Sequence, residues 1–235
     1  ANNEEFTIGY YMSRDLDLFN VDLGVRIDQI ERSGSVTDED HGDIDNYNID
    51  DTTNSFAVNI GRNLNDNLDI SLGYASVERL PSVVELFMNG PHLATGRFEV
   101  GDPTLSSETS NNFDITLNYE KDDFYAYASF YITDVDNYIA LIDEEEDHDD
   151  HEDEHHDEED EDGHHDDDDH GDDHDDHGHG NLIHANYMQE DAEFDGYEFE
   201  IGRTLDIGMG ELKVSFGRDV VNDMFSDGHY VPRIN

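Results

Sequence analysis

The chain has 235 residues and a formal net charge of −51, from 62 Asp and Glu against 11 Lys and Arg. This charge excludes nucleic acid as a partner, because phosphates would be repelled, and it favours cations. The lack of cysteine excludes disulfides and thiolate metal sites, and no apolar run approaches the ~20 residues of a membrane helix.

Eight segments alternate between apolar and polar residues, which indicates β-strands with one apolar and one polar face. In chain order they lie at residues 6–13, 19–28, 56–61, 68–74, 113–119, 124–132, 197–202 and 212–217. Each is near the ~9–11 residues with which a tilted strand crosses a bilayer. No segment carries a convincing helical pattern. We therefore predict an all-β fold of about eight strands.

The connections between these strands alternate in length. Short polar turns are predicted at Ser13–Asp15, Asn63–Asn67, Glu120–Asp123 and Leu205–Gly210. Long segments are predicted at Gln29–Thr52, Ser76–Glu108, Asp134–Glu190 and after Val221. An antiparallel up-and-down meander puts all the short turns at one end and all the long loops at the other. Outer-membrane barrels have this asymmetry, whereas a soluble β-sandwich more often mixes its connection lengths.

The two faces of the strands differ in the same way along the whole chain. The polar face carries Asp22, Arg26, Asn59, Asp69, Asp114, Asn118, Glu198, Glu200 and Lys213. Alternation alone fits a small soluble barrel with an apolar interior, and it also fits a membrane barrel with a lipid-facing band and a wet lumen. The loop asymmetry, the frequent glycine, and the Tyr and Phe near strand ends favour the transmembrane β-barrel.

One segment, Asp143–Gly180, consists only of Asp, Glu, His and Gly, and we call it the acidic histidine tract. Its ten histidines are His148, His151, His155, His156, His164, His165, His170, His174, His177 and His179. Imidazole nitrogens beside carboxylates suit Zn²⁺, with Ni²⁺ and Cu²⁺ as alternatives. Carboxylates alone would suggest Ca²⁺. We predict an extracellular metal-binding loop with several interchangeable sites; a solvating spacer is the alternative.

A longer motif runs from Glu78 to Asn112. Its characteristic residues are Arg79, Pro81, Glu85, Leu86, Phe87, Gly101, Asp102, Leu105, Glu108, Ser110 and Asn112. This pattern resembles TonB-dependent outer-membrane receptors, and the runs at Asn137, at Phe194 and from Tyr230 to Ile234 fit the same family. The Gly90–Glu99 run is most similar to the subgroup taken to be zinc receptors.

The resemblance implies a 22-stranded barrel closed by an N-terminal plug, in the bacterial outer membrane and driven by the TonB complex. Residues 1–235 would then be part of the barrel, with the plug outside them and outer-membrane lipid around them. The implied function is uptake of zinc or a similar divalent metal. The alternatives are another cargo (an iron chelate, haem or copper) and a soluble or surface β protein that buffers metal.

The resemblance also implies that His92 is a substrate ligand; a hydrogen-bonded loop histidine is the alternative. Glu99, seven residues later, is a weaker candidate as a partner ligand. His41 in an acidic turn, and His184 and His229 at loop ends, are weaker candidates. Zn²⁺ is expected as cargo and no prosthetic group is expected. The chain has no nucleophile in a recognisable setting, no phosphate-binding glycine loop and no His-Glu-x-x-His helix, so we do not predict an enzyme.

Overall fold

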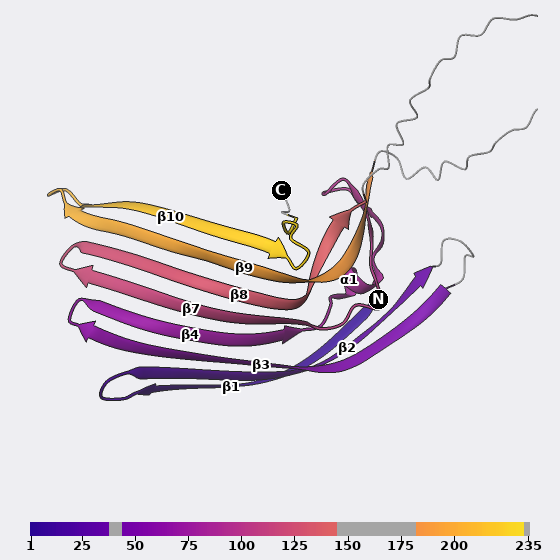
Figure 1. Cartoon of the computed structure of the whole chain (residues 1–235), viewed down its shortest axis with the longest axis horizontal. Coiled ribbons are helices and arrows are strands. Elements are labelled where there is room, and N and C mark those ends of the chain that lie inside the picture. Colours follow the sequence, from indigo (N-terminus) through magenta and orange to yellow (C-terminus); the bar gives the residue numbers. More distant parts are fainter. Residues whose placement is uncertain (38–43, 145–181, 233–235) are drawn as a thin grey trace, which may run out of the picture.

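The computed structural model describes residues 1–37, 44–144 and 182–232 as a single sheet with one short helix (Figure 1). The elements are β1 (Asn2–Asp15), β2 (Asn20–Thr37), β3 (Ile44–Asn65), β4 (Leu68–Arg79), α1 (Val83–Phe87), β5 (Asn89–His92), β6 (Arg97–Val100), β7 (Glu108–Lys121), β8 (Phe124–Asp143), β9 (Ile183–Asp206) and β10 (Glu211–Phe225). No helix in these ranges is long and apolar enough to cross a membrane.

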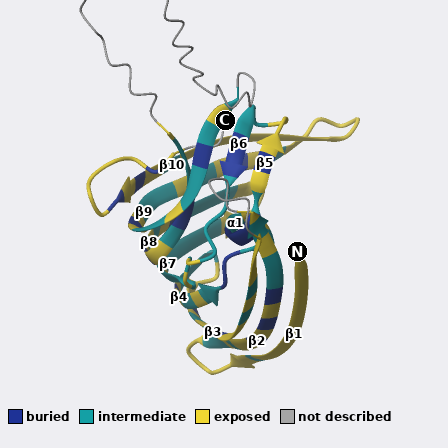
Figure 2. Cartoon of the chain, turned by 90° about the vertical axis from the view of Figure 1, so that its right-hand side faces the viewer, coloured by how far each residue is buried: buried dark blue, intermediate teal, exposed yellow. Residues whose placement is uncertain are grey.

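The long strands form an antiparallel meander in the order β1-β2-β3-β4-β7-β8-β9, with β10 beside β9. All eight predicted strands are present, and tight turns join them at one end of the sheet (Figure 1). Three of these turns fall where they were predicted, but the predicted Ser13–Asp15 turn belongs to β1, and the chain turns at residues 16–19 instead. Figure 2, which views the molecule from one end of the strands, shows that the sheet is curved rather than flat. The prediction of an all-β meander is confirmed.

The strands are longer than predicted, so the long loops are shorter. The β2–β3 ladder continues without a break to the pair Thr37–Ile44, well inside the predicted Gln29–Thr52 loop. β8 and β9 likewise continue to Asp143 and from Ile183. These extensions lack a long apolar–polar alternation, because residues 138–142 of β8 are a continuous apolar run and the start of β9 alternates only from Ile183 to Tyr187. A reading based on alternation therefore ends each strand too early.

The predicted Ser76–Glu108 loop is also more ordered than expected. It contains α1, which the sequence did not predict, and the short hairpin β5–β6. Ser82 caps α1: its hydroxyl accepts from the backbone N–H of Glu85, whose side chain accepts in return from the Ser82 N–H. β6 pairs in parallel with the start of β9, from Arg97–Ile183 to Val100–Asn186. This parallel pairing is the one departure from the meander among the described strands.

The apolar face of the long strands is exposed rather than packed into a core. Its large exposed side chains include Phe6, Ile8, Tyr10, Leu23, Val25, Ile27, Phe56, Ile60, Leu72, Phe113, Phe130, Ile132, Ile201, Val214 and Phe216. An exposed apolar surface that spans the whole sheet indicates contact with lipid. The alternative of a soluble barrel with these side chains inside is therefore not supported.

The polar face of the sheet is held together by hydrogen bonds between neighbouring strands. The Tyr11 hydroxyl donates to Asp22 at 2.9 Å, and Asn118 donates to Asp69 at 2.9 Å. Lys213 lies 4.7 Å from the centre of the Tyr125 ring. Such contacts suit a wet lumen wall, because these polar groups have partners without having to be buried.

The buried residues gather at the opposite end from the tight turns. Leu86 of α1 and Ala185 of β9 are fully buried, and Ala140, Ala192, Phe225 and Val231 form a small core. A bilayer needs only about 9–11 residues per strand, whereas β9 has 24. The end of the sheet that carries this core therefore extends beyond the membrane, on the side of the long connections.

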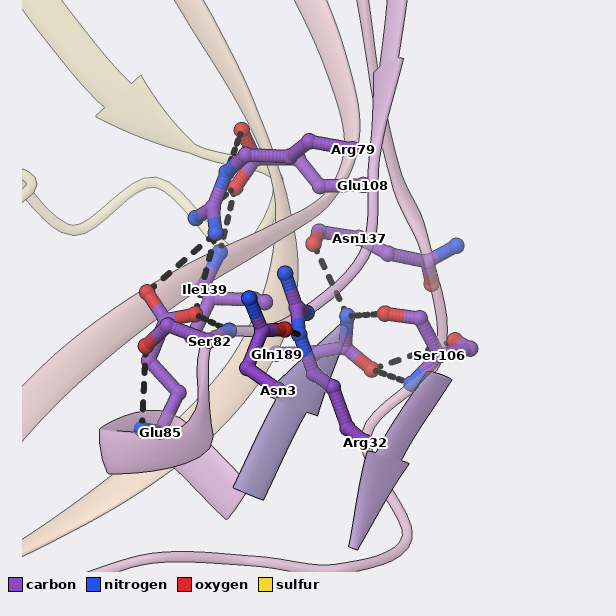
Figure 3. Close-up of polar contacts among 10 residues, drawn as sticks. All are labelled: Asn3, Arg32, Arg79, Ser82, Glu85, Ser106, Glu108, Asn137, Ile139 and Gln189. Atoms are coloured by element: carbon purple, nitrogen blue, oxygen red, sulfur yellow. Dashed lines mark hydrogen bonds and ion pairs between the residues drawn. The ribbon is translucent and has the colours of Figure 1, made fainter. Parts of the chain in front are cut away.

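A bulge bends β8 and β9 at this end. Their register shifts between Val135 and Tyr138, and Asn137 in the bulge has φ +56°. The Asn137 N–H donates to Asp191, and the Gln189 side-chain amide donates to the Asn137 carbonyl at 3.0 Å. Gln189 also bonds the backbone of Ser106 (Figure 3). Beyond the bulge, β8 and β9 turn away from the plane of the sheet (Figure 1).

The family-like motif forms the base of the segment that carries β5 and β6. The Arg79 guanidinium donates to Glu108 at 2.8 Å and to Glu85 at 3.0 Å (Figure 3). Glu85 also accepts from the Ser82 N–H, and Glu108 accepts from the Ile139 N–H of β8. One arginine thus ties α1, β7 and β8 together. The motif residues Arg79, Glu85 and Glu108 have a structural role here.

Candidate metal-binding site

The β5–β6 hairpin brings His92 and Glu99 together. His92 ends β5, Glu99 lies in β6, and the turn between them closes on the His92 carbonyl, which accepts from the N–H groups of Thr95 and Gly96 at 3.1 Å. Gly96 has φ +69°, which glycine adopts readily. As a result His92 Nδ1 lies 2.7 Å from Glu99 Oε1. We call this pair the His92–Glu99 dyad.

The carboxylate of the dyad is enclosed and the imidazole is not. The side chain of Glu99 is 3% exposed, whereas that of His92 is 48% exposed. Two hydroxyl groups also donate to Glu99: Thr95 to Oε1 at 3.0 Å and Tyr187 of β9 to Oε2 at 3.4 Å. These three donors offset the cost of burying the carboxylate.

Tyr187 lies about 19 residues along β9 from the tight turn, well beyond the ~9–11 residues that a bilayer spans. Burial and the neighbouring charge of Glu99 raise the pKa of Tyr187 to about 12. Its hydroxyl therefore remains a hydrogen-bond donor to Glu99 throughout the physiological pH range.

The acidic histidine tract leaves the sheet beside this hairpin. Arg97 of β6 donates to both carboxylate oxygens of Asp143, the last residue of β8, at 2.5 and 2.8 Å. On the other side of the tract, Ile183 donates its N–H to the Gly96 carbonyl at 3.2 Å, and the N–H of Glu144 reaches the His184 carbonyl. We call the described residues on either side of the tract its roots (143–144 and 183–184). Both roots are bound to the hairpin that carries the dyad, or to each other.

Only part of the predicted metal-ligand set falls in the described residues. Residues 145–180, with all ten tract histidines, and His41 lie outside them. Asp143, the predicted start of the tract, belongs to β8. His184 stacks on Phe98, and His229 Nδ1 lies 2.7 Å from Asp227 Oδ2 in a separate turn. Within the described ranges, no three His, Asp or Glu side chains converge as a metal cluster.

The sequence analysis missed the groups that surround the dyad. Thr95, Arg97 and Tyr187 were not candidates, because nothing in their local sequence marks them. Tyr187 is 88 residues from Glu99 in the chain, and it reaches Glu99 only because β6 pairs in parallel with β9. An imidazole and a carboxylate can hold a borderline metal ion such as Zn²⁺, with the remaining ligands supplied by water or another segment.

Comparison with known proteins supports the fold. A family model described as "TonB dependent receptor-like, beta-barrel" matches residues 3–235. Among solved structures, "Copper transporter OprC" is 18% identical with a TM-score of 0.67, and the alignment covers 99% of this chain and 31% of that one. The hemophore receptor HasR of Serratia marcescens, in a complex with hemophore HasA and heme, is 15% identical with a TM-score of 0.59, covering 93% and 34%.

A third similar structure is the FrpB iron transporter from Neisseria meningitidis, 15% identical, with a TM-score of 0.51, covering 96% of this chain and 27% of that one. The chain thus spans about a third of the length of the solved structures that it matches. At these identities the likeness concerns the fold, and the cargo has to be argued from this chain's own residues.

Proposed function

Because the chain belongs to the TonB-dependent receptor β-barrel family of bacterial outer-membrane proteins, we propose that it is part of an importer for zinc or a similar divalent metal. The acidic histidine tract collects ions outside the cell, and the His92–Glu99 dyad holds one at the mouth of the barrel. Uptake then depends on the TonB complex, as the family resemblance implies.

The observation that carries this proposal is the position of the dyad. Arg97 and Gly96 in the hairpin contact Asp143 and Ile183 at the two roots of the tract. An ion released from either root therefore emerges within a few residues of His92. The residues that flank the tract and the hairpin that carries the dyad are therefore close in space, although they are far apart in the sequence.

The negative charge of the chain also supports the proposal that ions collect at the tract and pass to the dyad. With 62 acidic side chains, the chain raises the local concentration of cations, and this effect weakens as salt screens it. A collecting segment has to release its ions as well as bind them. Many equivalent His and carboxylate ligands give several weak sites rather than one tight site, which suits transfer to the dyad.

Copper, haem or an iron chelate is the alternative cargo, since similar structures are named for copper, heme and iron. Zinc is favoured because the tract combines ten imidazoles with carboxylates and the chain has no cysteine thiolate, the soft ligand preferred by Cu(I). A siderophore or haem also needs more than a pair of ligands to be recognised, and the dyad is a pair.

Uptake of zinc, copper and iron into cells that carry the protein, with each metal depleted in turn, tests the choice of cargo. We expect growth under zinc depletion to depend on the protein and to weaken when the ten tract histidines become asparagine. Titration of a 143–180 peptide against an equally acidic histidine-free peptide tests the tract alone. Equal Zn²⁺ binding by the two peptides would remove the capture step.

A further inference from the structure

The two halves of the His92–Glu99 dyad meet solvent differently. The His92 side chain is half exposed, while Glu99 lies behind it with 3% of its side chain accessible. An ion that arrives from water therefore meets the imidazole first. A zinc ligand must also approach to about 2.0–2.2 Å with a free lone pair, so the lone pairs of Glu99 decide its role.

Three of the roughly four acceptor positions of this carboxylate already face donors. Oε1 of Glu99 accepts from His92 Nδ1 and from the Thr95 hydroxyl, at 2.7 and 3.0 Å, and Oε2 accepts from the Tyr187 hydroxyl at 3.4 Å. To bind metal directly, Glu99 would have to break some of these bonds inside an enclosed pocket. The cost of leaving buried donors unpaired opposes this rearrangement.

From this geometry we infer that Glu99 is a positioning residue: it fixes His92 as the tautomer with its proton on Nδ1, which leaves Nε2 to bind the metal. The inference deepens the proposed function and rests on it. A carboxylate can only accept, so the ring nitrogen that faces it must donate. Metal-binding histidines are commonly oriented this way, and loss of the second group typically weakens metal affinity 10–100-fold.

Thr95 and Tyr187 complete the arrangement by holding the carboxylate in place. Thr95 is fixed in turn, because its hydroxyl and its N–H both lie within hydrogen-bonding distance of the His92 carbonyl. Tyr187 comes from β9, one strand away. The orientation of His92 is therefore set by a hairpin turn and a neighbouring strand together, and not by the loop alone.

The test uses the protein purified in detergent, with the ten tract histidines replaced by asparagine. Four histidines then remain, so nitrogen-15 NMR of labelled histidine can follow His92 individually, with His92→Ala to assign its signal. The Zn²⁺ dissociation constant is measured alongside for Glu99→Ala, Glu99→Gln and Tyr187→Phe. Asp227→Ala, which removes the carboxylate beside His229, is the matched control.

We expect His92 to carry its proton on Nδ1. Glu99→Ala should move the proton to Nε2 and raise the dissociation constant 10–100-fold. Glu99→Gln, whose amide oxygen still accepts, should keep the tautomer and lose less affinity. Tyr187→Phe should raise the constant by a smaller factor without removing a charge, so it carries the test if Glu99→Ala fails to fold. Asp227→Ala should change neither quantity.

Three results would overturn the inference while the proposed function stands, provided His92→Ala still weakens binding. One is an unchanged tautomer and affinity in Glu99→Ala. Another is lost affinity with the tautomer preserved, which would make Glu99 a ligand itself. The third is wild-type affinity in Tyr187→Phe when Glu99→Ala does not fold. If His92→Ala binds Zn²⁺ like its parent, the proposed metal site itself is lost.

Discussion

The described part of the chain contains two His–carboxylate pairs with the same nitrogen–oxygen distance but different surroundings. His92 Nδ1–Glu99 Oε1 and His229 Nδ1–Asp227 Oδ2 are both 2.7 Å. Asp227 is two residues from its histidine and half exposed, whereas Glu99 is seven residues away, buried, and bonded by two further hydroxyls. Equal distances therefore hide an unequal degree of preorganisation.

The difference lies in what holds each carboxylate. The pKa of Asp227 is lowered first by the backbone N–H of His229 and then by the His229 side chain, all within one turn. Such local turns form wherever the sequence allows them. Glu99 is held by the β5–β6 hairpin and by β9, so its position reports the fold as a whole. A site whose geometry is set by several elements is the better candidate for binding.

The largest expected effect comes from removing each imidazole. In the background without tract histidines, His92→Ala should raise the Zn²⁺ dissociation constant at least tenfold, or ~1.4 kcal/mol, because the ligand nitrogen proposed for the dyad is lost. His229→Ala is the matched change and should leave the constant unchanged. Isothermal titration of both variants checks this. Equal losses would show that preorganisation does not separate the two pairs.

A substitution at a closely packed glycine should disturb the His92–Glu99 dyad and leave the His229–Asp227 pair unchanged. A Cβ on Gly101 would lie 2.7–2.9 Å from backbone atoms of residues 85–87, so Gly101→Ala must displace either α1 or the end of β6. We expect the free energy of unfolding to fall by roughly 1–3 kcal/mol and Zn²⁺ to bind more weakly at His92.

Gly90→Ala is the control for this prediction, because a Cβ there meets nothing within 4 Å. It lies opposite Glu99 in the same hairpin and should leave both stability and affinity unchanged. Thermal unfolding and Zn²⁺ titration compare the two variants. A Gly101→Ala protein as stable as its parent would mean that the hairpin can shift freely, against the rigid support argued for the dyad.

A fall in pH should release the metal without breaking the Arg97–Asp143 ion pair. Imidazole must be neutral to bind metal, so affinity should fall as the pH drops through ~6.5. The Arg97 guanidinium lowers the pKa of Asp143, so this pair contributes stability above the ordinary carboxyl pKa of ~3.9 and loses it only as the pH falls through the lowered value. Between these limits the roots of the tract stay tied.

Zn²⁺ titration and hydrogen exchange at Ile183, each at pH 7 and pH 5, check this separation. The amide of Ile183 donates to Gly96 beside the Arg97–Asp143 pair, so it reports on the roots. We expect binding to fall while exchange at this amide stays slow. Binding that is unchanged at pH 5 would point to carboxylate-only sites.

The sequence predicted the strands well wherever contact with lipid requires every second side chain to be apolar. In β3, the run from Phe56 to Ile60 alternates because every second residue faces the bilayer, and the strand was predicted there. The outer part of β3, from Ile44, has no such constraint and looked like a loop. The same reasoning explains why three of the four tight turns were placed correctly and the lengths of the outer connections were not.

The site was predictable only in its local half. His92 and Glu99 share one motif run; the resemblance marked His92, and Glu99 was a candidate as a carboxylate seven residues later. The contact with Tyr187 depends on the parallel pairing of Arg97–Val100 with β9, a four-residue strand with no alternation long enough to recognise. Arg97 likewise gained its role only through Asp143, 46 residues away. Long-range pairing of short strands is what a single sequence does not reveal.

The smallest expected effect concerns Tyr187, which bonds the carboxylate of the His92–Glu99 dyad. Burial and Glu99 raise the pKa of Tyr187 to about 12, and no tyrosine bonds Asp227 in the described residues. Between the ordinary tyrosine pKa of ~10 and this value the folded protein holds a proton that the unfolded chain has lost, so stability falls as pH rises. Burial also raises the pKa of Tyr138, so spectrophotometric titration of tyrosinate should show a late-titrating fraction that becomes smaller in Tyr187→Phe. The same decrease in Glu99→Gln would show that the carboxylate and the phenol are coupled; a late-titrating fraction as large in Tyr187→Phe as in the parent would remove Tyr187 from the support of the dyad.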